Sequence, residues 1–310
     1  MSAVARPVVG RPAGAMRPVY ARAERGATAG LVANVLLAAG KLVAGVLSGS
    51  FALIADAVNS LGDVVASTVV LASLRFAQRP PDEGHPYGHT RIEAIAGAIV
   101  SVLVVASAGA IAVEAFRRIG QVHPAPPAWT LWVAGLTAVL KEALYHYQWR
   151  LGRKSGSLAT MANAWDHRAD ALAALAVLAG LALVRFGGPA WRSADEVAAL
   201  CVVVVILWGG LRLLLGSIHE LMDAQAEPAY IDRLRTVALD VPGIRAVEKL
   251  LARKTGLEYL VDIHVEVDPA MTVEAGHRLG HAVKDRLLAA HPEVREVLVH
   301  LEPHRGAGRG

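Results

Sequence analysis

Six segments of the chain consist almost entirely of apolar residues, and each is long enough to cross a lipid bilayer as a helix. About 20 such residues are needed to span a hydrocarbon core roughly 30 Å thick. Short connections join the segments in three consecutive pairs, so each pair is expected to form a helical hairpin. The predicted spans cover residues 27–48, 51–75, 92–116, 129–149, 158–184 and 195–218.

After the sixth span, the pattern becomes that of a small soluble domain. Apolar positions at helical spacing predict a helix that stops at Pro242-Gly243, and alternating positions predict two strands around a turn at 254–256. Thr272 is the expected N-cap of a second helix, and "VREVLVHLEP" predicts a third strand. The order αββαβ therefore predicts a two-layer α+β domain over residues 223–304.

The composition agrees with a membrane protein that carries a soluble tail. Of its 310 residues, 54% are hydrophobic and 19% are charged, whereas soluble domains have about 45–50% and about 25%. The fold class expected is thus a polytopic α-helical membrane protein with six transmembrane helices, over residues 27–222. The single cysteine, Cys201, excludes an intrachain disulfide and is expected to be buried.

The basic residues indicate how the chain is oriented. Eleven Lys and Arg residues lie in the N-terminal leader and in the connections after the second and fourth spans, against four on the opposite side. The positive-inside rule then places both termini in the cytoplasm and the spans in the inner (plasma) membrane. The net charge of +4 reflects this orientation, and nucleic-acid binding is not expected. The leader, 1–26, lacks the apolar core of a secretory signal and is expected to be disordered; residues 305–310 form a short tail.

Four polar residues inside the predicted spans form two pairs at i,i+4 spacing: Asn59 with Asp63, and Asp166 with Asp170. This spacing stacks two side chains on one helix face. A carboxylate in a bilayer costs several kcal/mol unless it is paired, hydrated or metal-bound. Two such faces turned toward each other offer oxygen donors to a divalent cation. Hydrogen bonding to a neighbouring helix is the alternative, and it fits Asn59 best.

A second candidate metal site lies in the connection after the second span. Asp82, His85 and His89 are close together there, among turn-forming residues. Carboxylate and imidazole groups at such short spacing can share one metal ion. A plain solvated turn is the alternative interpretation.

The segments "SGSFALIADAVNSLGDVVAS", "HPYGHTRIEAIAG", "NAWDHRADA" and "VDIHVEVDP" resemble, in this order, the motifs of the cation diffusion facilitator family of divalent-metal exporters. The resemblance extends from residue 27 to residue 304. It implies a homodimer of six-span subunits in a lipid bilayer, each with a cytoplasmic metallochaperone-like domain. It further implies export of a divalent metal in exchange for protons, with metal ions as substrate and as possible regulatory ligands.

The resemblance also implies roles for individual residues. The transport site of the family maps onto Asn59, Asp63, Asp166 and Asp170, and the loop site onto Asp82, His85 and His89. The metal site of the cytoplasmic domain maps onto His264, His277, His300 and Glu302, with Glu248 where relatives can have a histidine. A basic–acidic pair that ties the dimer in relatives maps onto Arg91 and Asp223.

The transport site departs from that of zinc carriers in the family, which are similar in having His-x-x-x-Asp on one or both helices. Asn59 and Asp166 stand at the positions open to histidine. His167 is rotated by about 100° from Asp166 on a helix, so we expect it to point away from the site. Oxygen ligands suit manganese, whereas imidazole favours zinc, copper and nickel. Manganese is the first expectation, iron(II) the second, and zinc or cadmium the third.

Carboxylates crowded in a low-dielectric pocket favour proton binding when no metal is present. Metal/proton antiport by alternating access is therefore expected, with Asn59 tuning selectivity. The alternative is a membrane-anchored metal-sensing scaffold that has lost transport, which only Asn59 favours. The spans contain no nucleophile–base pair, so no enzyme is expected. Lys141 and Glu142, in the fourth span, are assigned to packing, snorkelling or a helix–helix ion pair rather than to metal binding.

Overall fold

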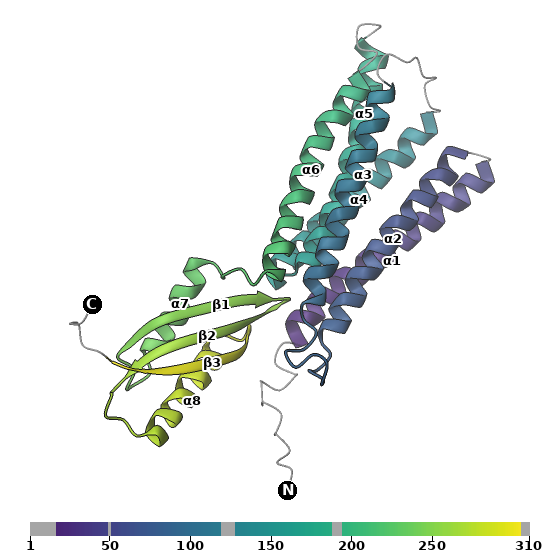
Figure 1. Cartoon of the computed structure of the whole chain (residues 1–310). Helices are drawn as coiled ribbons and strands as arrows, with labels where there is room; N and C mark the ends of the chain where they lie inside the picture. Colours follow the sequence, from purple (N-terminus) through teal and green to yellow (C-terminus); the bar gives the residue numbers. More distant parts are fainter. Residues whose placement is uncertain (1–16, 49–50, 119–127, 188–193, 305–310) are drawn as a thin grey trace. The chain divides into compact units, whose positions relative to one another are not determined.

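The computed structural model describes residues 17–48, 51–118, 128–187 and 194–304 (Figure 1). The chain divides into a helical unit, Tyr20–Ile218, and a second unit that contains the chain from His219 onward. The helical unit is built from α1 (Arg17–Ser48), α2 (Phe51–Ala77), α3 (Ile92–Arg118), α4 (Ala128–Ser155), α5 (Leu158–Gly187) and α6 (Ala194–Leu221).

Each of the six predicted spans lies within one of these helices. Within the described residues, windows in α1, α2, α3 and α6 are long and apolar enough to cross a membrane. The helices α4 and α5 carry the polar positions that lower their mean hydropathy, among them Lys141 and Asp166. Cys201 is exposed on α6 beside exposed Val204 and Val205, so the expectation that it is buried was wrong.

The first helix begins earlier than the sequence predicted. Residues 17–26, assigned to a disordered leader, form the first turns of α1. The segment has a buried apolar residue every three or four positions: Tyr20, Ala23 and Ala27. This spacing gives it an apolar face that packs as a helix, which is why it is not disordered. Residues 1–16 lie outside the described part of the chain.

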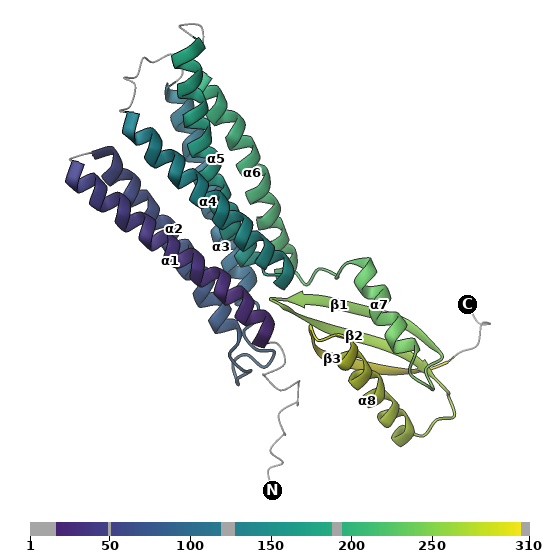
Figure 2. The ribbon, with the colours of Figure 1, turned by 180° about the vertical axis from the view of Figure 1, so that it is seen from behind.

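Within the helical unit, α5 packs against α3 and α4, and α2 packs against α3 (Figure 2). The start of α5 is fixed by a buried carboxylate of α3. Glu93 Oε1 accepts hydrogen bonds from Ser157 Oγ at 2.5 Å and from the backbone N–H of Ala159 at 2.8 Å. A carboxylate at a helix N-terminus satisfies otherwise unpaired N–H groups, and here it sets the height of the acidic pair on α5.

The second unit contains α7 (Pro228–Leu239), β1 (Ala246–Thr255), β2 (Glu258–Val267), α8 (Val273–Ala290) and β3 (Val294–Pro303). The predicted order αββαβ is confirmed. The sheet has the order β1-β2-β3, with β1 antiparallel and β3 parallel to β2. Thr272 caps α8 as expected, since its side chain accepts a hydrogen bond from the N–H of Ala275 at 3.2 Å.

Both helices of this unit cover one face of the sheet (Figure 2). Val261, Ile263 and Val265 of β2 lie in the core with Leu234 of α7 and Leu287 of α8. Because successive strand residues point to opposite faces, the residues between them on β2 lie on the face that α7 and α8 leave uncovered.

Candidate metal centres

In the helical unit, an ammonium group lies between the carboxylates of two helices. Lys141 Nζ of α4 is 2.6 Å from Asp63 Oδ2 of α2 and 2.7 Å from Asp170 Oδ2 of α5. The lysine side chain is only 2% exposed. The structure therefore brings the two predicted acidic faces together, and it adds a residue from a third helix that the sequence interpretation had left out of the site.

The third carboxylate is less well satisfied. Asp166 lies one helical turn before Asp170 on α5, and its Oδ2 is buried without a hydrogen-bond partner within the described residues. A buried, unpaired carboxylate oxygen is costly, so this atom is available to a cation. The side chain of Asn59 lies outside the described part, so its predicted place in the transport site is still a prediction.

His167 does not lie where the sequence analysis placed it. Ligand atoms of Asp166, His167 and Asp170 all lie within 4.8 Å of one another. Both imidazole nitrogens are buried and, among the described residues, have no hydrogen-bond partner. The rotation of about 100° per residue moves the Cβ to an adjacent face, but the imidazole is long enough to bring a ring nitrogen back beside the carboxylates.

A second ion pair joins α4 and α5 beside the site. Arg168 of α5 donates a hydrogen bond to Glu142 of α4, and His146 Nε2 lies 3.0 Å from the same carboxylate. The guanidinium of Arg168 also lies over the Tyr145 ring, at 4.7 Å from its centroid. Lys141 and Glu142 thus both form helix–helix ion pairs, one of the alternatives considered for them.

Four neutral side chains form a buried hydrogen-bond chain across α1, α2, α4 and α5, which we call the amide chain: Asn34, Ser67, Asn163 and Gln148. Asn34 Nδ2 donates to Ser67 Oγ at 3.0 Å, and Ser67 Oγ donates to Asn163 Oδ1 at 3.2 Å. Asn163 Nδ2 then donates to Gln148 Oε1 at 2.8 Å, and Gln148 Nε2 donates to the Gly26 carbonyl at 3.4 Å. Each member donates to the next, so the bonds reinforce one another.

The amide chain lies directly beside the acidic site. Ser67 follows Asp63 by one helical turn, and Asn163 precedes Asp166 by three residues. Asn34 Nδ2 also donates to the Asp63 carbonyl at 3.3 Å. The three helices that carry the site, α2, α4 and α5, are therefore joined to one another and to α1 at this level by hydrogen bonds between uncharged groups.

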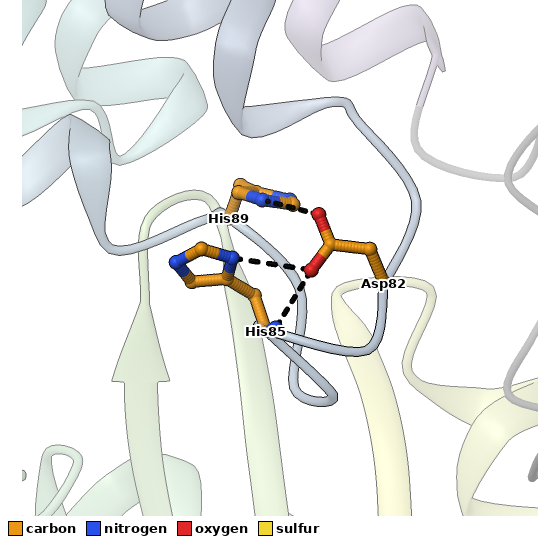
Figure 3. Close-up of side chains that lie close together, drawn as sticks. All are labelled: Asp82, His85 and His89. Atoms are coloured by element: carbon orange, nitrogen blue, oxygen red, sulfur yellow. Dashed lines mark hydrogen bonds and ion pairs between the residues drawn. The ribbon is translucent and has the colours of Figure 1, made fainter.

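The loop residues Asp82, His85 and His89 come together as the sequence analysis expected (Figure 3). His85 Nδ1 lies 3.1 Å from Asp82 Oδ1, and His89 Nε2 lies 3.2 Å from Asp82 Oδ2. The backbone N–H of His85 donates to Asp82 Oδ1 at 2.7 Å. This backbone hydrogen bond, with smaller contributions from both imidazoles, holds the pKa of Asp82 below its usual value. An ionised carboxylate and two imidazoles could hold a metal ion.

The uncovered face of the sheet carries a third cluster. His264 of β2 pairs with His300 of β3 in the strand register, and Glu302 Oε1 lies 2.7 Å from His264 Nδ1 and 3.8 Å from His300 Nε2. A hydrogen bond with Glu248 lowers the pKa of Glu302, and His264 lowers it further. The same hydrogen bond and the negative charge of Glu302 raise the pKa of Glu248. Glu248, on β1, therefore belongs to this cluster as well.

His277 is not part of this cluster within one chain. It lies on α8, which packs on the opposite face of the sheet, and its ring meets that of His281 with a centroid distance of 4.6 Å. Its predicted role as a ligand would need a second copy of the chain. His304, which the sequence analysis left aside, lies with its Nδ1 2.5 Å from Glu266 Oε2. No spacing in the sequence indicated this pair, because the two residues are far apart in the chain and meet only where the parallel strands β2 and β3 end side by side.

The predicted dimer-linking pair, Arg91 and Asp223, belongs to two different units of the chain. Asp223 lies two residues after the end of α6 and has a positive φ of 58°. Its Oδ1 lies 3.7 Å from Arg253 Nε of β1. The role of Arg91 and Asp223 in a dimer stays a prediction.

Comparisons with known proteins cover nearly the whole chain. The family model described as the cation efflux transmembrane domain matches residues 27–222, and that of the cation efflux protein cytoplasmic domain matches residues 226–304. The manganese efflux system protein MneP of Bacillus subtilis (strain 168) is 32% identical, over 88% of this chain and 94% of its own length.

Two other relatives are similar at the same level. Metal tolerance protein 2 of Oryza sativa subsp. japonica is 34% identical, over 88% of this chain and 76% of its own length. The magnetosome protein MamB of Paramagnetospirillum magneticum is 32% identical, over 87% of this chain and 91% of its own length. Among solved structures, a cadmium form of the MamM CTD is 29% identical and covers 25% of this chain and 98% of its own, with a TM-score of 0.25.

Proposed function

Since the chain belongs to the cation efflux family of divalent-metal transporters, we propose that it is a proton-coupled antiporter that exports manganese(II) from the cytoplasm. The observation that carries this proposal is the convergence of Asp63, Asp166 and Asp170 from two helices on one buried cation position. Carboxylates are the ligands that manganese prefers, and MneP is a relative whose name states manganese efflux.

The proposed cycle uses the carboxylates for both metal and protons. A metal ion that enters from the cytoplasm binds the ionised carboxylates, and protons replace it on the other side of the membrane. Asp63, Asp166 and Asp170 act as ligands and proton carriers. Asn59, whose amide cannot carry a proton in this way, tunes the choice of metal.

Two further parts of the proposal concern the setting of the site. We place the chain in the inner (plasma) membrane as a homodimer with both termini in the cytoplasm. The loop cluster around Asp82 and the sheet-face cluster around His264 serve as additional metal sites that report the cytoplasmic metal concentration. Support comes from the imidazole and carboxylate groups that meet in both clusters.

Iron(II) is the second candidate substrate, and the position of His167 is the observation that favours it. An imidazole nitrogen beside two carboxylates makes a mixed ligand set, which suits iron(II) and zinc better than manganese. Under the manganese proposal, His167 is not a ligand.

The test is transport into proteoliposomes that hold a pH gradient, with manganese, iron(II), zinc and cadmium compared. The variants are Asp166→His and His167→Ala, with His219→Ala, exposed at the end of α6, as the matched control. The proposal is supported if the wild type transports manganese, Asp166→His shifts this preference toward zinc, and His167→Ala leaves manganese transport intact. Loss of transport in His167→Ala makes the imidazole a ligand and favours iron(II). Transport of none of the four metals by the wild type would instead favour the metal-sensing scaffold.

A further inference from the structure

We propose that Lys141 is a tethered counter-cation: its ammonium occupies the metal position in the empty carrier, and the incoming metal ion has to displace it. This inference rests on the proposed function, because it concerns the same site. It assigns a selectivity role to a residue of α4, a helix that contributes none of the predicted ligands.

The first argument is the identity of the atoms that the ammonium binds. Lys141 Nζ lies within 2.7 Å of one oxygen of Asp63 and one of Asp170, which come from different helices. A metal ion that links α2 to α5 must bind these two carboxylates. The ammonium and the metal therefore compete for the same donors, and both cannot hold them at full strength.

The second argument is that α4 and α5 are joined by other polar contacts besides this lysine. Glu142, the next residue on α4, already pairs with Arg168 of α5, and Gln148 and Asn163 join the same two helices through the amide chain. A buried lysine is costly in a membrane unless it is paired. A structural role alone would not require the lysine to be centred on the carboxylates of both α2 and α5.

The third argument is the carboxylate that the ammonium leaves free. Asp166 Oδ2 is buried, and within the described part of the chain it has no hydrogen-bond partner. An arriving metal ion can bind this oxygen before the lysine has moved. Displacement then proceeds stepwise, from Asp166 to the oxygens that the ammonium releases.

The arrangement discriminates between cations by charge. A monovalent cation offers the carboxylates no more charge than the ammonium already provides, whereas a divalent ion offers twice as much. Sodium and potassium therefore cannot displace Lys141, and a divalent metal can. When the metal leaves, the ammonium returns and neutralises part of the charge of the empty site.

The test measures manganese binding to the full-length protein in detergent, from the free Mn²⁺ signal in electron paramagnetic resonance. Lys141→Met removes the competing charge and should tighten binding by about tenfold or more. Its melting temperature without metal should fall, and manganese should raise it by more than in the wild type. Lys154→Met, at the exposed end of α4, is the matched control and should bind manganese as the wild type does.

A second variant keeps the proposal testable where Lys141→Met does not fold. Lys141→Arg retains a cation that can bind both carboxylates at once, so manganese binding should weaken by about three- to tenfold. The proposal is overturned if Lys141→Arg binds manganese as tightly as the wild type or more tightly. It is also overturned if folded Lys141→Met binds manganese no more tightly than the wild type.

The charge discrimination has its own measurement. Manganese binding to Lys141→Met should be weaker in sodium chloride than in choline chloride of equal ionic strength, because sodium can enter the vacated position and choline cannot. The wild type should show no such difference. Equal binding of Lys141→Met in both salts contradicts the role in selectivity. If the wild type neither binds nor transports metal, the proposed function itself is wrong. If the wild type transports metal but Lys141→Met binds manganese with unaltered affinity, only this inference is wrong.

Discussion

The proposed transport site and the sheet-face cluster are both built from carboxylates, but they neutralise the negative charge differently. In the membrane, Asp63 and Asp170 share the ammonium of Lys141, whose side chain is only 2% exposed. On the sheet, Glu302 is satisfied by His264 and by a hydrogen bond with Glu248, and the His300 side chain is 62% exposed. One site contains its own cation, and the other relies on imidazoles, on the hydrogen bond between two carboxyl groups and on its exposure to solvent.

Solvent exposure explains this difference. An unpaired charge on the sheet is hydrated, so that cluster can be empty at little cost. An unpaired carboxylate between membrane helices costs several kcal/mol, so an empty site there needs a counter-charge or bound protons. A membrane site for a cation should therefore be examined together with the basic residues of the neighbouring helices.

The largest expected difference between the two sites is in transport. Asp63→Asn or Asp170→Asn removes a ligand and leaves the buried Lys141 short of a partner, a change worth about 3–5 kcal/mol. We expect the initial rate of manganese transport into proteoliposomes to fall by about 100-fold or more. His300→Ala, in the sheet-face cluster, should change this rate by less than about threefold. Comparable losses in all three variants would show that the two sites do not differ in this way.

A smaller effect, on stability, is expected from changes in the amide chain of the helical unit. Gln148→Leu leaves the Asn163 amide unpaired in the interior, which costs about 1–3 kcal/mol. Gly30→Ala should act on the same contact, because a Cβ there would lie 1.8 Å from Gln148 Nε2. Both variants should lower the melting temperature in detergent, with Ser107→Ala, exposed on α3, as the control. Melting temperatures equal to that of the control would mean that the amide chain does not stabilise the unit.

The smallest effect is expected at Glu248, on the sheet. Its pKa is raised above the usual value near 4.5 by the hydrogen bond and charge of Glu302. A raised carboxyl pKa contributes stability at low pH that is lost as the pH rises through the folded-state value. At neutral pH, Glu248→Gln should therefore slow hydrogen exchange of β1–β3 amides slightly, and the difference should vanish as the pH falls toward 4.5. Faster exchange in Glu248→Gln than in the wild type at neutral pH would show that the ionised Glu248 stabilises the domain and would contradict this prediction.

The sequence predicted features that depend on one element at a time. The six spans, the αββαβ order and the i,i+4 faces of α2 and α5 follow from spacing along a single helix or strand. The loop cluster was also predictable, because Asp82, His85 and His89 lie within eight consecutive positions. Each of these features is local, so tertiary packing did not need to be known.

Features that depend on which elements face each other could not be predicted in this way. Lys141 enters the site from a third helix, and only the packing of α4 against α5 brings it there. A lysine within an apolar span was the available signal, since it requires a partner. His277 fails to reach His264 because α8 covers the other face of the sheet, which helical periodicity alone does not specify.

The position of Lys141 also has an electrical consequence. Moving one elementary charge through the membrane potential exchanges about 2.3 kcal/mol per 100 mV. Three ionised carboxylates that changed sides alone would carry three negative charges through that field. With the ammonium bound between Asp63 and Asp170, as in this structure, one of these charges is cancelled. In the proposed cycle, the lysine would therefore reduce the voltage dependence of the empty carrier's return step.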